Sequence, residues 1–373
     1  MNESVTEYDL HGMVGIRLLG ATADEVKMIT RQIGPIQATL DRDPDIIIRF
    51  VDTFPINGRI RYLGVDEAGF TDDAFLVMRS KHKSKAKVQI PFDQIGSEQI
   101  EMVVERGLTA VPHLIAIINL TALGKGALPM HASAFTYNGV GVMATGWAKG
   151  GKTETLLSFM AQGAEHVGDE WIYISADGQK MYGIPEPIRI WDWHLQDLPQ
   201  YWEQVSPSDK ARLRGLDFVV SSMEKATNHP SLGKTKPAKL LQRATPIVKR
   251  QQYVHLEPHK LFGSSMGPMV GSLDKIFLVA SHETADITVT PINAAEVAER
   301  MVFSLQDERE ELMSYYRKFR FAFPDRQNDL LEQAETIQRR ALQRILNGKE
   351  SYLVYHPYPV AIPALYDAMH QFV

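Results

Sequence analysis

The sequence predicts an α/β protein with a mostly β (α+β) N-terminal domain over residues 1–125 and an α/β domain over residues 126–373. Three observations predict this division. Short apolar runs separated by turn residues fill the first 97 residues. The segment LGKGALP at 123–129 then interrupts the pattern with two glycines and a proline. A strand, a glycine-rich loop and a helix follow in that order between residues 130 and 160.

The N-terminal elements are justified by local patterns. Apolar β-type runs at 45–51, 59–65 and 73–80 predict strands, and residues 23–33 predict a helix. Residues 98–122 show a helical pattern up to the glycine-proline break. We therefore expect an accessory or substrate-binding domain built mainly from strands.

The C-terminal elements begin with a hairpin. Two β-type runs between residues 130 and 145 flank Asn138-Gly139, a strong hairpin signal. A helix after Thr153 ends at Gly163, and short strands precede and follow Asp169. We expect helical structure to about residue 226, a Lys-rich loop at 233–250, strands near 275–290, two long helices between 294 and 346, and a closing strand and helix at 351–373.

The composition excludes several classes of function. A net charge of −5 gives no general attraction to nucleic acid or anionic membranes. The absence of cysteine excludes disulfides, thiolate zinc sites and cysteine nucleophiles. No run approaches the roughly 20 apolar residues of a membrane span, and the first residues lack a signal-peptide pattern. We expect a cytoplasmic protein without nucleic-acid or membrane partners, and the sequence leaves open whether it forms a homo-oligomer.

The stretch GWAKGGKTETLL at 146–157 fits the pattern G-x-x-x-x-G-K-[ST] and lies between a predicted strand and a predicted helix. In that arrangement, successive backbone N–H groups and the helix N-terminus converge on phosphate oxygens. Lys152 would neutralise the β- and γ-phosphates, and the Thr153 hydroxyl would ligate Mg²⁺. The predicted nucleotide-binding residues are Gly146, Trp147, Ala148, Lys149, Gly150, Gly151, Lys152, Thr153 and Glu154. The alternative is a purely structural glycine turn.

Two acids supply the expected remaining metal ligands. Asp169 and Glu170 follow Thr153 by 16 and 17 positions, at the end of a short strand expected to run beside the strand that enters the glycine loop. The predicted metal ligands are therefore Thr153, Asp169 and Glu170. The alternative is an acidic turn.

Residues 130–171, from MHASAF through GWAKGGKTE to GDEW, resemble the core of the HPr kinase/phosphorylase family, which is related in fold to phosphoenolpyruvate carboxykinases. The matching features are a histidine before a hairpin, the glycine loop followed by glutamate, a glycine that ends the helix, and an acidic pair. The chain departs from the family in having Glu170 as its second acid and in its first 125 residues. The sequence therefore does not predict an authentic HPr kinase.

The resemblance implies an ATP- and Mg²⁺-dependent kinase that transfers the γ-phosphate to a hydroxyl of a small molecule or of a peptide or protein. It implies Asp169 as the base, and we name Asp169, His131 and Lys152 as candidate catalytic residues. His131 is expected to bond Asp169 or a phosphate oxygen, with simple packing as the alternative. A non-catalytic nucleotide-binding module that signals to a partner protein is the second hypothesis. A carboxykinase-like reaction is the third.

Overall fold

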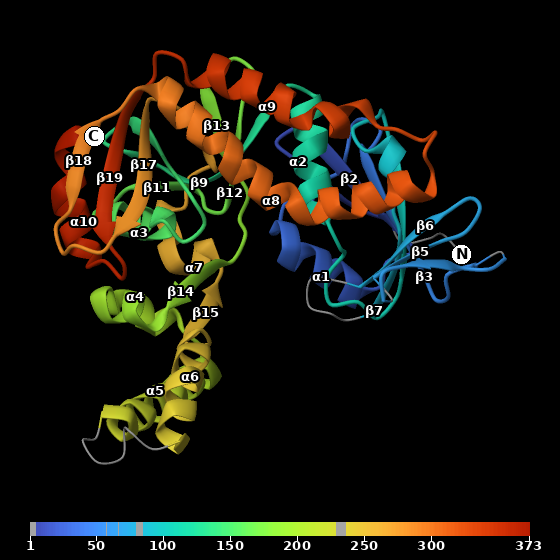
Figure 1. Cartoon of the computed structure of the whole chain (residues 1–373). Coiled ribbons are helices and arrows are strands. Elements are labelled where there is room, and N and C mark those ends of the chain that lie inside the picture. Colours follow the sequence, from blue (N-terminus) through green and yellow to red (C-terminus); the bar gives the residue numbers. More distant parts are fainter. Residues whose placement is uncertain (1–4, 57, 66, 80–84, 229–235) are drawn as a thin grey trace.

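The structure, a computed structural model, describes residues 5–56, 58–65, 67–79, 85–228 and 236–373. It confirms a mixed α/β protein. Two sheets lie beside each other, and two long helices cross from one sheet to the other (Figure 1). No helix of the described ranges is long and apolar enough to cross a membrane.

In the described N-terminal residues, eight strands form one sheet in the order β1-β2-β3-β8-β7-β6-β5-β4. The neighbours β2, β3 and β8 are parallel, and the remaining pairs are antiparallel. The strands are β1 (Val5–Leu10), β2 (Val14–Leu19), β3 (Ile46–Val51), β4 (Arg61–Leu63), β5 (Ala68–Phe70), β6 (Phe75–Arg79), β7 (Lys85–Gln89) and β8 (Ile100–Glu105). The predicted helix is α1 (Ala23–Ile33), whose Met28, Ile29 and Ile33 are buried in the core of this sheet.

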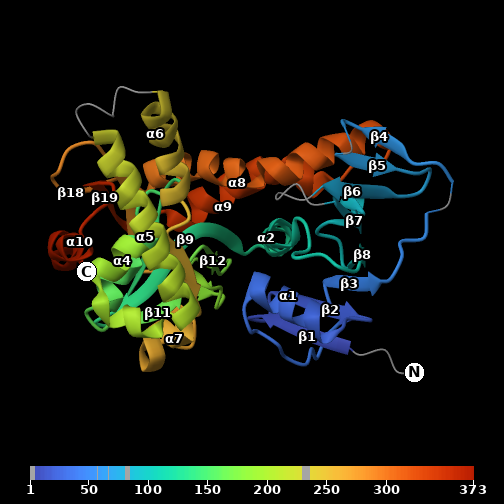
Figure 2. The same cartoon turned by 90° about the horizontal axis from the view of Figure 1, so that it is seen from below.

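The helix expected over residues 98–122 is wrong in its first half. Residues Ile100–Glu105 form β8, and only Leu114–Gly124 form a helix, α2. The burial pattern of β8 alternates between buried and half-buried residues, which is the period of a strand. Helix α2 contacts both β2 and β9 and lies between the two sheets (Figure 2). Whether residues 1–125 and 126–373 fold as separate domains stays a prediction.

The second sheet runs in the order β16-β13-β12-β9-β10-β17-β19-β18 within the described residues, with β11 also paired to β9. Its strands are β9 (Leu128–Tyr137), β10 (Val140–Thr145), β11 (Glu165–Gly168), β12 (Trp171–Ile174), β13 (Lys180–Gly183), β16 (Val270–Ser272), β17 (Lys275–His282), β18 (Thr288–Pro291) and β19 (Glu350–Pro357). The predicted hairpin is confirmed, since β9 and β10 are antiparallel about Asn138 and Gly139, whose φ angles are 50° and 81°. Helices α3 (Lys152–Met160) and α10 (Ile362–Met369) pack together beside this sheet.

Helices α8 (Ala294–Ala322) and α9 (Asp329–Leu346) confirm the two predicted long helices and connect the two sheets. The buried residues of α8 up to Leu305 belong to the core of the second sheet, and those from Leu312 onward belong to the core of the first. On α9, Leu331 and Ala334 belong to the first core, and the buried residues from Ala341 to Leu346 belong to the second core. Each helix therefore changes core near its middle.

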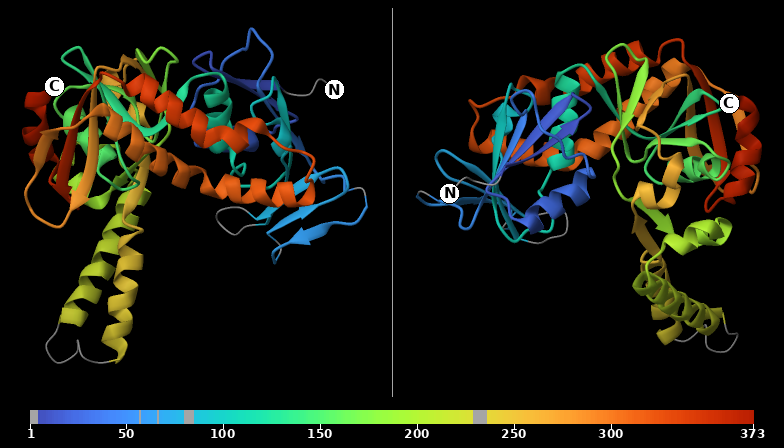
Figure 3. Two further views of the ribbon diagram at one scale, coloured as in Figure 1. Left: turned by 45° about the horizontal axis from the view of Figure 1, so that its top comes forward. Right: turned by 180° about the vertical axis from the view of Figure 1, so that it is seen from behind.

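A two-helix arm projects from the second sheet (Figure 3). It consists of α5 (Pro207–Asn228) and α6 (Lys236–Lys249), which pack along each other. The expected Lys-rich loop at 233–250 is therefore wrong over residues 236–249, and its first residues lie outside the described ranges. The short helix α4 (Asp192–Asp197), the pair β14 (Ile188–Trp191) and β15 (Tyr253–Leu256), and α7 (Pro258–Phe262) join the arm to the sheet.

Candidate functional site

The glycine loop connects β10 to α3. Gly146 and Gly151 have φ angles of 153° and 106°, and Lys149 has a φ of 64°. A Cβ at Gly146 would collide with the carbonyl oxygen of Val279 on β17. The loop therefore requires glycine both for its backbone angles and for its close approach to the neighbouring strand.

His356 on β19 packs against the glycine loop. This histidine is fully buried, and its Nε2 lies 2.8 Å from the carbonyl oxygen of Gly150. Its Nδ1 lies 2.7 Å from the carbonyl oxygen of Pro357. A Cβ at Gly151 would overlap the imidazole ring. The ring therefore fixes the distance between the loop and the end of β19.

The start of α3 is tied to the acidic pair. The Thr153 hydroxyl donates to Oδ2 of Asp169 at 3.0 Å, whereas Oδ1 of Asp169 is buried without a hydrogen-bond partner among the described residues. Asp169 is only 4% exposed. Burial raises the pKa of Asp169 to about 7, and the charge of Glu170 adds to the effect. The carboxyl group is therefore poised to change protonation near neutral pH.

The position of Asp169 arises differently from the expectation. Strand β11 does not run beside β10, because β9 lies between them. Strands β11 and β12 both pair with β9, and the acids occupy the irregular step between them, where Glu170 has a φ of 63°. The N–H of Ala132 on β9 donates to the carbonyl oxygen of Glu170 at 3.1 Å. Because Ala132 is paired with Thr145, the step lies level with the end of β10 and the start of the loop.

Lys152 is buried beside these acids. Its Nζ donates to the carbonyl oxygen of Trp147 at 3.1 Å, so the side chain folds back across the loop. Burial lowers the pKa of Lys152, and the charges of Glu170, Asp169 and Glu308 oppose this shift. The loop thus holds a desolvated ammonium group, which a bound anion would stabilise.

The hydrogen bonds and ion pairs of His131 within the described residues go to neither Asp169 nor Thr153. Its Nε2 lies 3.2 Å from Oε2 of Glu170, and its Nδ1 lies 2.6 Å from Oε1 of Glu308 on α8. Burial lowers the pKa of His131, but the two carboxylates together outweigh it and the net pKa is raised. The hydrogen bond from His131 is the main cause of the lowered pKa of Glu170, whose side chain is 48% exposed. His131 also stacks on Trp171, with ring centroids 5.6 Å apart.

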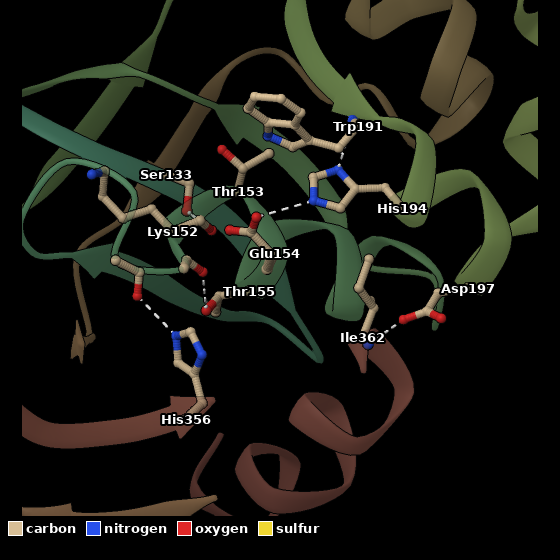
Figure 4. A network of polar contacts seen from close by, with 12 residues as sticks. Ser133, Lys152, Thr153, Glu154, Thr155, Trp191, His194, Asp197, His356 and Ile362 are labelled. Atoms are coloured by element: carbon tan, nitrogen blue, oxygen red, sulfur yellow. Dashed lines mark hydrogen bonds and ion pairs between the residues drawn. The ribbon is translucent and has the colours of Figure 1, made fainter. Parts of the chain in front are cut away.

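Glu154, predicted to bind nucleotide, is buried and hydrogen-bonded to His194, as Figure 4 shows. The backbone N–H of Trp191 donates to Nδ1 of His194, so the imidazole N–H is on Nε2 and donates to Glu154 at 3.0 Å. Burial raises the pKa of Glu154, but the interactions with His194, a backbone N–H and His356 together outweigh burial and the net pKa is lowered. The side chain of Glu154 therefore anchors α3 to α4.

Two adjoining cavities border the loop. The first, of about 310 Å³, is lined by His131, Ala148, Lys149, Gly151, Lys152, Thr153, Glu154, Asp169, Glu170, Arg189, Trp191 and Tyr358. The second, of about 520 Å³, shares Lys149, Trp191 and Tyr358 with the first and also contains Trp193. The predicted catalytic and metal-binding residues therefore surround one cavity. Trp147 is exposed at the tip of the loop, and Gly146 and Gly150 are buried within it.

Sequence reasoning missed the residues that come from distant elements: Arg189, His194, Glu308, His356 and Tyr358. Glu308 had a detectable signal. Met301, Ser304 and Glu308 follow at spacings of three and four on α8, and the Ser304 hydroxyl donates to the carbonyl oxygen of Gly146 at 3.3 Å. An acid that continues the buried stripe of an amphipathic helix marks a site or an ion pair. Glu186 was also missed, and burial raises its pKa well above the ordinary value, with the charges of Glu170 and Asp169 adding to the effect.

The described ranges contain no group of three or more His, Asp or Glu side chains arranged to hold a metal ion. The residues present nevertheless fit a magnesium site completed by phosphate. The orphaned oxygen of Asp169 and the Thr153 hydroxyl are the kinds of oxygen ligand that Mg²⁺ takes, and Mg²⁺ commonly uses only one or two protein ligands beside substrate phosphates. No known family model matches this chain, and no curated protein matches it.

Proposed function

We propose that the protein is a kinase that transfers the γ-phosphate of ATP to a hydroxyl group in the presence of Mg²⁺. One observation carries the proposal: the glycine loop presents Lys152 and Thr153 to the same cavity as a buried carboxyl group, Asp169, that is hydrogen-bonded to Thr153. A glycine turn with only a structural role needs neither the buried lysine nor the unpartnered carboxyl oxygen.

The two cavities suit the two ends of a nucleotide. The phosphates would lie on the loop, where the N–H groups of Gly151, Lys152 and Thr153 precede or begin α3. The base would enter the second cavity, which α4 and the arm helices line, where the ring centroids of Trp193 and Tyr358 lie 6.0 Å apart. Aromatic walls suit a planar base. Lys152 would leave the carbonyl of Trp147 to pair with the phosphates.

When bound, Mg²⁺ would neutralise charge on the phosphates and orient the γ-phosphate, with Thr153 and Asp169 as its protein ligands. Glu170 lines the same cavity but is engaged by His131, so its role is to fix the histidine and to set the local charge. His131 and Glu308 are positioning residues for the segment between β11 and β12 that carries Asp169 and Glu170.

In the transfer step, Asp169 accepts the proton of the acceptor hydroxyl as the acceptor oxygen bonds to the γ-phosphorus. The bond between that phosphorus and the bridging oxygen breaks, and the electron pair leaves with ADP. Burial raises the pKa of Asp169, and a more basic carboxylate takes the proton more readily.

Within this proposal, residues 126–373 form a P-loop domain of the HPr kinase type. The order of hairpin, loop, helix and acidic pair along the chain supports it. The N-terminal part would then bind the acceptor or a partner.

The test measures nucleotide binding and phosphate transfer separately. Calorimetry with ADP and ATP, each with Mg²⁺, is combined with ATP consumption in the presence and absence of extract from the source cells. We expect binding by the wild type and by Asp169→Asn, and extract-dependent consumption by the wild type alone. Binding without consumption under any condition would instead support the non-catalytic signalling module. No binding at all would reject both functions.

A further inference from the structure

We propose that the cleft between the 106–113 loop and α8 is the acceptor site, and that the acceptor carries a carboxylate that pairs with Arg309. The inference rests on the proposed kinase function. The cleft has a volume of about 330 Å³ and is lined by Gln32, residues 108–116, Asn119, Trp171, Glu308, Arg309, Glu311 and Leu312. Both the N-terminal sheet region and α8 thus contribute to it.

Arg309 is a buried cation that forms no ion pair with a carboxylate of the described residues. It is 9% exposed, and among the described residues its recorded hydrogen bond goes to the neutral side chain of Gln338. Burial lowers the pKa of Arg309 to about 10, and the charge of Glu335 compensates only in part. A guanidinium group usually enters the interior paired with an anion, and it binds carboxylates through two parallel N–H bonds.

Arg309 occupies a position on α8 where packing alone would favour an apolar residue. It lies on the buried stripe of α8 between Leu305 and Leu312, where the helix passes from one core to the other. Gln338 occupies the matching place on α9, between Ala334 and Ala341. An apolar pair there would close the junction without any desolvation cost, so two polar residues at this point favour a ligand role.

A second donor faces the same cleft. Asn119 on α2 accepts a hydrogen bond from the Tyr173 hydroxyl at 2.7 Å through its Oδ1. Its NH₂ group is therefore directed away from Tyr173. Asn119 and Arg309 line both this cleft and a small cavity directly beside it. Amide and guanidinium donors together suit a carboxylate.

The cleft adjoins the reacting groups. Glu308 and Trp171 line it, and both contact His131, which in turn contacts Glu170. A ligand anchored at Arg309 would have to extend past Glu308, Trp171 and His131 to bring its hydroxyl to Asp169. Because Glu308 and Glu311 also line the cleft, it favours a single negative charge over a phosphate dianion. These contacts define the acceptor as a hydroxyl compound with one carboxylate, either a free hydroxy acid or the C-terminus of a peptide.

The first arm of the test measures binding and needs no ATP. Thermal unfolding is followed with D-glycerate, L-serine and a tripeptide that ends in serine, against glycerol and the amidated tripeptide. We expect at least one free carboxylate to raise the melting temperature of the wild type, with about 10- to 100-fold weaker binding in Arg309→Met and partial retention in Arg309→Lys. The free acid and the peptide distinguish the two sources. Arg317→Met, on the exposed side of α8, is the control and should bind like the wild type.

The second arm measures transfer. In Arg309→Met, we expect half-maximal ATP consumption to need more extract, as a raised KM for the acceptor requires. The affinity for ADP should stay unchanged. The proposal is overturned if no carboxylate binds in an Arg309-dependent way, or if such binding neither competes with the acceptor nor supports ATP consumption. A lack of consumption by the wild type rejects the kinase function itself and leaves the binding arm to decide the carboxylate site.

Discussion

The hydroxyl of Thr153 and the carboxyl group of Asp169 meet at 3.0 Å, although the strands that precede them, β10 and β11, lie on opposite sides of β9. The contact arises because the chain steps from β11 to β12 beside Ala132, level with the end of β10. It connects the first turn of α3 to the acidic step, so a ligand on the loop and the protonation of Asp169 are physically coupled.

Replacing Asp169 by Asn should stabilise the fold above neutral pH. The pKa of about 7 exceeds the ordinary value of 3.8, so between these values the folded state holds a proton that the unfolded chain has lost. Stability of the wild type therefore falls as the pH rises through this window. We expect Asp169→Asn to match the wild type near pH 4 and to exceed it above pH 7, by up to about 4 kcal/mol. Urea unfolding across pH measures the difference, and a gap that does not change with pH would contradict a raised pKa.

The same variant should lose phosphate transfer by about 10² to 10⁴-fold while it still binds nucleotide, because it lacks the group that takes the proton. Calorimetry with ADP and an ATP-consumption assay check the two effects. If Asp169 acts chiefly as a metal ligand, binding will also weaken and the Mg²⁺ requirement will shift upward. Unchanged transfer would remove the carboxylate from the chemistry.

Replacing Lys152 by Met should weaken nucleotide binding by about 10- to 100-fold without unfolding the chain, since the ammonium group contacts only a loop carbonyl in the described structure. Calorimetry with ADP measures the affinity, and circular dichroism verifies the fold. Lys180→Met, on the exposed face of β13, is the matched control. Equal affinity of both variants for ADP would return the loop to a structural role.

Replacing Gly151 by Ala should destabilise the protein and abolish nucleotide binding. The added Cβ overlaps the buried ring of His356, and the φ of 106° is unfavourable for alanine. Gly215→Ala is the control, because Gly215 lies within α5 with free space around it and should gain about 0.5–1 kcal/mol. Thermal unfolding compares the two variants. The predicted support of the loop by His356 fails if Gly151→Ala melts like the wild type.

Replacing His194 by Ala should cost about 3–5 kcal/mol near neutral pH, because it leaves the Glu154 carboxylate buried without its donor. The pKa of Glu154 is lowered in the folded state, so this stability is present above the ordinary value of 4.5 and is lost as the pH falls through the lowered pKa. The difference from the wild type should therefore shrink in acid. The exposed pair of His259 and Glu257 gives the control His259→Ala, for which we expect less than about 1 kcal/mol.

Replacing Glu308 by Gln should lower the pKa of His131, because one of the two carboxylates that raise it is removed while the burial that lowers it stays. Titration of the imidazole resonances by NMR measures the shift. Glu310→Gln, an exposed neighbour on α8, should leave the pKa unchanged. An unmoved His131 resonance in the Glu308 variant would show that the contact between α8 and His131 is not formed.

Patterns over a few residues determined much of the fold. The Asn138-Gly139 hairpin, helix α1 and the helix that ends before Gly163 are each set by turn chemistry and periodicity within the segment itself. The helix that was wrongly expected at the start of residues 98–122 shows the limit of such local patterns. The strand Ile100–Glu105 is formed by pairing with β7 and with β3, and β3 lies far away in the sequence.

For the candidate site, the sequence by itself determined the glycine loop and the acidic pair, because the required residues are consecutive and their backbone positions follow from a strand, a turn and a helix. Only the tertiary structure decided what surrounds them. Glu308 reaches His131 from α8, His356 reaches the loop from β19, and the side chain of Glu154 is drawn away to His194. These contacts join residues that lie between 40 and 206 positions apart in the chain. Packing over such separations leaves no local pattern beyond a charged residue on a buried helical stripe.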